Sequence, residues 1–97
     1  MDTLNLYREK IKEALLAYSQ ESVPQADVEV ETILDTQNDH YQLMTVGWRG
    51  EQRIHGTVLH LDIRGGKIWI QHDGTEEGIA HRLVAAGVPK SDIVLGF

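Results

Sequence analysis

The start of the chain has hydrophobic positions with a helical period. Apolar side chains recur there at three- and four-residue steps, which predicts an amphipathic helix from residue 2 to about residue 20. The apolar stripe consists of Leu4, Tyr7, Ile11, Leu15 and Tyr18. We expect Pro24 to end the segment, because proline cannot continue a helix.

The pattern then changes to a period of two, which is typical of strands with one exposed face. Val28, Val30 and Thr32 alternate with acidic residues and predict the first strand. Asn38-Asp39 marks the turn that follows it. Three more strands are expected over residues 40–48, 53–64 and 67–72, separated by turns at Gly50 and at Gly65-Gly66.

The Gly65-Gly66 pair predicts a tight hairpin, because glycine accepts the positive φ angles of the favoured two-residue turns. Counting outward from this turn gives an apolar core face with the expected pairs Ile63 with Ile68, Leu61 with Ile70, and Leu59 with His72. The opposite face of the hairpin is expected to carry Asp62 beside Trp69 and His60 beside Gln71.

The preceding hairpin is apolar on both faces, and we expect a bulge near Gly56. Its residues divide into Tyr41 and Leu43 on one face and Met44, Val46 and Trp48 on the other. Helices can cover one face of the predicted sheet. The other apolar face therefore favours a partner as its cover.

A second helix is expected over residues 75–86. Asp73 and Glu76 have the spacing of a capping box, and Gly87 suits the left-handed stop. The residues expected to face inward are Ile79, Leu83 and Ala86, and a short last strand is expected at residues 93–95. The complete pattern predicts an α+β fold with an N-terminal helix, a four-stranded antiparallel meander, a second helix and a short C-terminal strand.

The length and the net charge of the chain limit the classes of function that it can have. The 97 residues suit one domain, and the net charge of −6 repels a DNA backbone. Basic residues do not gather in one patch, so direct DNA binding is not expected. The chain has no cysteine, no secretory-signal pattern and no apolar run of membrane-spanning length, which favours a cytoplasmic protein without a membrane partner.

The histidines and carboxylates have simple structural interpretations. His60 and Asp62 could form a His–carboxylate pair, but we favour two solvated residues, since no nucleophile or metal set accompanies them. The five histidines include no pair at helical metal-binding spacing. Helix initiation explains the carboxylates of residues 73–77. We therefore expect no catalytic residue, no metal and no cofactor.

Two charged segments have plain structural interpretations. The segment at residues 64–67, Arg-Gly-Gly-Lys, lacks the phosphate-loop pattern, which favours an ordinary hairpin. The acidic stripe of Asp27, Glu29 and Glu31 could receive a basic partner, but a solubilising strand face is the favoured interpretation.

The two tryptophans leave a core role and an interface role open. Trp69 is expected on the face opposite the core, with His60, Asp62 and Gln71 around it. Trp48 would extend its apolar area. We expect these five residues to form a partner interface.

Several short strings in the second half of the chain carry a family resemblance. They include Arg53-Ile54-His55-Gly56, Gly66-Lys67-Ile68-Trp69-Ile70-Gln71, Asp73-Gly74-Thr75-Glu76 and Leu95-Gly96-Phe97. In this order and spacing they resemble the XisI family, the cyanobacterial proteins named as fdxN-element excision controlling factors. The family pattern normally continues past Leu-Gly-Phe, so a chain ending at Phe97 is expected to lack the usual tail.

The resemblance implies control of the excision of a DNA element during heterocyst differentiation. It implies a non-enzymatic protein that acts through contacts with a XisH-like partner or a site-specific recombinase, and a second copy of the chain is a further candidate partner. The alternatives are a DNA-binding accessory factor and an antitoxin-like inhibitor of an endonuclease-like XisH partner. The charge disfavours the DNA-binding class. A small enzyme is disfavoured by the missing nucleophile, base and metal set.

Overall fold

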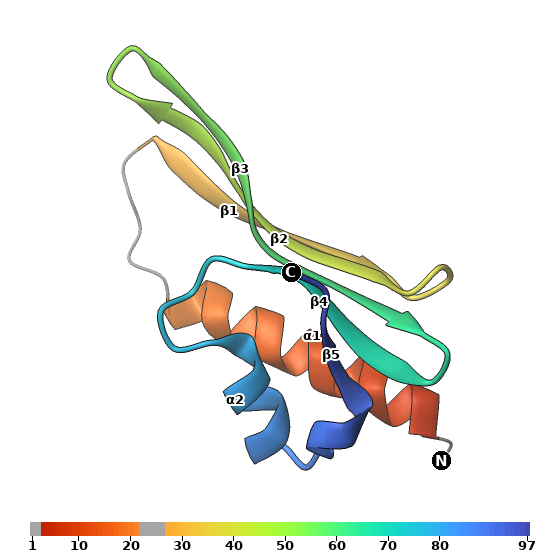
Figure 1. The fold of residues 1–97 in the computed structure, drawn as a ribbon. Coiled ribbons are helices and arrows are strands. Elements are labelled where there is room, and N and C mark those ends of the chain that lie inside the picture. Colours follow the sequence, from red (N-terminus) through yellow and green to blue (C-terminus); the bar gives the residue numbers. More distant parts are fainter. Residues whose placement is uncertain (1–2, 22–26) are drawn as a thin grey trace.

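The computed structural model describes residues 3–21 and 27–97, and Pro24 lies outside them. Helices and strands alternate little along the chain, so the fold is α+β (Figure 1). The elements are α1 (Thr3–Glu21), β1 (Val28–Asp35), β2 (His40–Arg49), β3 (Gln52–Arg64), β4 (Lys67–Asp73), α2 (Ile79–Ala85), a 3-10 turn (Lys90–Asp92) and β5 (Ile93–Leu95). These elements confirm the predicted order.

One five-stranded sheet has the order β1-β2-β3-β4-β5. Its first four strands form the predicted antiparallel meander, whereas β5 pairs with β4 in parallel. This parallel pairing follows from α2, which returns the chain along the sheet before β5 begins. The β2–β3 hairpin is the longest part of the sheet and projects beyond the helices (Figure 1).

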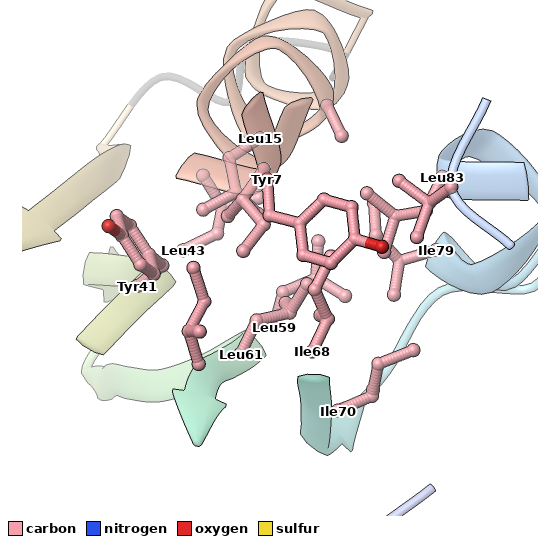
Figure 2. Close-up of a cluster of buried hydrophobic side chains, with 14 residues drawn as sticks. Tyr7, Leu15, Tyr41, Leu43, Leu59, Leu61, Ile68, Ile70, Ile79 and Leu83 are labelled. Atoms are coloured by element: carbon pink, nitrogen blue, oxygen red, sulfur yellow. The ribbon is translucent and has the colours of Figure 1, made fainter. Parts of the chain in front are cut away.

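Both helices pack on the same face of the sheet (Figure 1). Side chains of α1, α2 and strands β2 to β4 meet there in one cluster (Figure 2). Leu59, Leu61, Ile63, Ile68 and Ile70 are all buried in it, which confirms the predicted core face. The remaining buried members are Tyr7, Ile11, Ala14, Leu15, Tyr41, Leu43, Ile79, Leu83 and Val88.

The predicted stripe of α1 reaches the core only after its first turn. Tyr7, Ile11 and Leu15 are buried, but Leu4 is 37% exposed. Arg8, on the same helix, holds the turn before β2 through its bidentate bond to Asp39, at 2.8 and 3.1 Å. Asp39 has a φ of 58°, which agrees with the turn predicted at this position.

The described part of the sheet has two bulges, of which one corrects the register predicted for β3 and β4 and the other lies close to the bulge expected near Gly56. In β4 the extra residue is Gln71, so Leu59 pairs with Asp73 and not with His72, and His60 pairs with His72 and not with Gln71. In β3 the extra residue is Val58, two positions after Gly56, which pairs regularly with Thr45. A bulge inserts one unpaired residue, and cross-strand counting beyond it is therefore wrong by one. The pairs between the Gly65-Gly66 turn and the Gln71 bulge are as predicted.

Helix α2 starts later than predicted. It begins at Ile79 because the Asp73 carboxylate accepts the Ile79 backbone N–H at 2.8 Å and the Thr75 N–H at 2.9 Å, which holds the intervening residues in a loop. The capping box is thus replaced by a cap from a more distant carboxylate. The predicted stop at Gly87 is confirmed by its φ of 106°. The prediction that Ala86 faces inward is wrong, because Ala86 lies past the end of α2 and is exposed.

Candidate partner interface and its buried carboxylate

The sheet face opposite the helices is called the outer face here. Within residues 3–21 and 27–97, both helices pack against the other side (Figure 1). Strand alternation and register place on the outer face Glu29, Glu31, Ile33, Asp35, His40, Gln42, Met44, Val46, Trp48, Arg53, His55, Thr57, His60, Asp62, Arg64, Lys67, Trp69, His72 and Val94.

The centre of the outer face is a buried carboxylate. Asp62 is only 2% exposed although it lies on the side without helices. Its Oδ1 lies 2.9 Å from His40 Nδ1 and 3.0 Å from His60 Nε2. Its Oδ2 accepts a hydrogen bond from Gln71 Nε2 at 3.2 Å and lies 3.5 Å from the Arg64 guanidinium. These five residues are called the Asp62 cluster.

Backbone pairing explains why these side chains meet. His40 is the cross-strand partner of Asp62 on β2, and Trp69 is its partner on β4. His60 and Arg64 are two residues before and after Asp62 on the same strand, so they share its face. The bulge at Gln71 brings its amide to the same carboxylate.

The surroundings keep Asp62 ionised. Burial is the largest influence on its pKa and opposes ionisation. The hydrogen bond from His40, the charge of His60 and the amide of Gln71 outweigh that burial, so the pKa lies below the ordinary value. A paired, hydrogen-bonded carboxylate can remain charged in such a position.

The structure corrects the interpretation of His60 and Asp62 as solvated neighbours. Asp62 is buried and bonded, and the pair exists at 3.0 Å. Sequence reasoning missed His40 altogether, since it stands 22 residues before Asp62 in the chain. Local spacing carries no signal for such a pairing, which depends on the register between β2 and β3.

The predicted interface residues divide into two groups. His60, Asp62, Gln71 and the half-buried Trp69 lie together, whereas Trp48 stands near the turn of the β2–β3 hairpin. About eight residues of strand separate Trp48 from His40, or about 26 Å at about 3.3 Å per residue. Trp48 is 50% exposed, with the Arg53 guanidinium 5.3 Å from its ring centroid.

The hairpin predicted at residues 64–67 is confirmed, and the acidic stripe lies at the surface. Gly65 and Gly66 have φ values of 59° and 78°, as a two-residue hairpin turn requires. The acidic residues Asp27, Glu29 and Glu31 are exposed. Across residues 3–21 and 27–97, the helices are too short or too polar to cross a lipid bilayer.

The fold is that of a small α+β protein in which the described helices cover one face of the sheet and leave the outer face without a helix. The family model described as XisI protein matches residues 1–97. A solved XisI-like protein from Anabaena variabilis ATCC 29413 is 49% identical, with a TM-score of 0.92 over 96% of this chain and 85% of that one. The fdxN element excision controlling factor XisI from the same organism is 39% identical, with a TM-score of 0.84 over 99% and 93%.

Curated protein sequences contain no match to the chain. The family model and the two structures agree along the chain, and the chain therefore belongs to the XisI family. This membership confirms the resemblance drawn from its short sequence strings.

Proposed function

We propose that the chain is a non-enzymatic controlling factor for the excision of a DNA element of the fdxN type. The name of the 39% identical relative supports this role. The role is exerted through protein contacts, and a XisH-like protein or a site-specific recombinase is the partner class. A cytoplasmic location accompanies this role.

The observation that carries the proposal is the outer face. Trp69, Met44, Val46 and Val94 are half-buried there, and Ile33 is 43% exposed. An apolar area with an aromatic beside charged and polar groups is typical of an interface centre. We propose Trp69, His60, Asp62 and Gln71 as the anchor of the contact, with Trp48 as a separate contact on the projecting hairpin.

The test is direct binding between purified proteins. Trp69→Ala is expected to weaken binding to the purified XisH-like protein or recombinase by about tenfold or more, because loss of such an anchor typically costs about 2 kcal/mol. Leu16→Ala is the matched control, since Leu16 is an exposed apolar residue on α1. Unchanged binding by Trp69→Ala, with its circular dichroism equal to the parent, would overturn the proposal.

Two alternatives are outcomes of further measurements. A DNA-binding accessory factor is favoured locally by the hairpin end, where the Arg53 guanidinium lies 5.3 Å from the ring centroid of Trp48. We expect negligible DNA affinity in a mobility-shift titration at physiological salt, because the net charge is −6. Micromolar binding that Arg53→Ala abolishes would favour this alternative.

The second alternative is an antitoxin-like inhibitor. If the chain has this role, then adding it in stoichiometric amounts would suppress the nuclease activity of the purified XisH-like protein.

A further inference from the structure

The Asp62 cluster combines three side chains that are ligands of transition metals in proteins. We propose that His40, His60 and Asp62 form a binding site for a divalent ion of the zinc class, open toward the outer face. The donor atoms are His40 Nδ1, His60 Nε2 and Asp62 Oδ1. This site does not depend on the proposed role in excision.

Distances support the donor set. The ligand atoms of the three residues lie within 4.8 Å of one another, and both imidazole nitrogens lie within 3.0 Å of the same carboxylate oxygen. Zinc bonds nitrogen and oxygen at about 2.1 Å, so ligand atoms of a tetrahedral site are about 3.4 Å apart. Small rotations of the histidine side chains therefore admit the ion between the three atoms.

Rigid strands hold the donors in place. His40 and Asp62 are paired across β2 and β3, and His60 is two positions from Asp62 on the same face. Gln71 donates to Oδ2, which leaves Oδ1 directed at both histidines. Such hydrogen bonds to a ligating carboxylate orient it and strengthen metal binding.

The three proposed ligands differ in exposure, with the carboxylate buried and the two imidazoles open to solvent. The Asp62 side chain is 3% exposed, whereas those of His60 and His40 are 32% and 49% exposed. The carboxylate therefore anchors the ion from inside, and the imidazoles admit it from solvent. Three protein ligands leave a fourth position of a tetrahedral ion for water or for a group of a bound molecule.

One neighbouring charge opposes the ion. The Arg64 guanidinium lies 3.5 Å from Asp62 Oδ2 and competes for the negative charge, but its side chain is 62% exposed and is free to turn into solvent. Removing this charge should favour the metal. Arg64→Ala is therefore expected to tighten zinc binding several-fold, which is opposite in sign to the effect of every ligand substitution.

Isothermal titration calorimetry with Zn²⁺ tests the site on the chain without a polyhistidine tag. We expect one ion per chain, and His40→Ala, His60→Ala and Asp62→Asn should each weaken binding by about tenfold or more. His55→Ala and His81→Ala are the matched controls, because both histidines are exposed and lie outside the cluster. Circular dichroism of each variant separates loss of the site from loss of the fold.

Nitrogen-15 NMR of the histidine rings provides the second measurement. Zinc should shift Nδ1 of His40 and Nε2 of His60, because these are the nitrogens that face Asp62. One-to-one binding lost in all three ligand variants, with this pattern of shifts, supports the site. Absence of stoichiometric binding, or binding that survives the three substitutions, overturns it.

Discussion

The two faces of the sheet use the same strands in different ways. On the helix side, Leu59, Leu61 and Ile70 have no exposed surface and pack under α1 and α2. On the outer face, Trp69 and His60, each next to a core residue on its strand, remain half-buried. The first face is filled by the chain itself. The second has a polar centre and an apolar surround, and it is the face that we propose for partner binding.

The two faces also differ in how each holds a carboxylate, Asp73 on the helix side and Asp62 on the outer face. Asp73 faces the helix side, where the backbone N–H groups of Thr75 and Ile79 bind it. Asp62 faces outward, where side chains bind it, and His40 among them is half-exposed. These backbone donors and the Thr75 hydroxyl, which also donates to Asp73, all come from the loop before α2 and the start of that helix, so Asp73 shapes this loop. Imidazole donors can exchange their protons for a metal ion, so Asp62 has chemistry available beyond stability.

Leu61→Ala should have the largest effect on stability. Leu61 is fully buried beneath the helices, so its truncation leaves a cavity and should lower the free energy of unfolding by about 2–5 kcal/mol. Urea denaturation followed by circular dichroism measures the change. A loss well below this range would mean that the helix-covered face is not the tightly packed one.

Asp62→Ala should have an intermediate effect. It leaves the donors of His40, His60 and Gln71 without their acceptor, at a cost of about 1–3 kcal/mol, reduced where water reaches the imidazoles. The same denaturation assay applies. A cost equal to that of Leu61→Ala would place Asp62 with the structural core and weaken the contrast between the faces.

Asp73→Asn should cost about 1 kcal/mol at neutral pH, through the weakened cap of α2. Burial raises the pKa of Asp73, but the bonds from Thr75 and Ile79 outweigh it, and the folded pKa lies below the ordinary value of 3.8. The charged group therefore stabilises the fold above pH 3.8, and this contribution is lost as the pH falls through the lower folded pKa.

The measurement for Asp73→Asn is the unfolding free energy at pH 7 and at several values below pH 4. The difference from the parent chain should shrink on acidification. Glu76→Gln is the control, because Glu76 is an exposed acid in the same loop. A difference that stays constant with pH would show that the charge of Asp73 does not contribute.

Trp48→Ala should have the smallest effect. Trp48 is 50% exposed and lies at the far end of the outer face, so the free energy of unfolding should change by no more than about 0.5 kcal/mol. Comparing its partner binding with that of Trp69→Ala sharpens the division of the interface. Equal losses of binding in both variants would show one continuous contact along the outer face.

The sequence by itself determined the local elements. Apolar steps of three and four predicted α1, alternation predicted the strands, and the Gly65-Gly66 turn predicted the pairs of Ile63 and Leu61. These features depend on neighbours in the chain, so their physical causes are visible in the string of residues. The family resemblance rested on the same local strings.

Only the tertiary structure decided the Asp62 cluster. His40 meets Asp62 because of the β2–β3 register, and Gln71 meets it because of a bulge. Bulges and long-range pairings are set by how the whole sheet packs against the helices, and no local spacing encodes them. The parallel pairing of β5 has the same origin, since it depends on where α2 returns the chain. The burial of a charged residue on the face without helices is likewise a property of the assembled sheet.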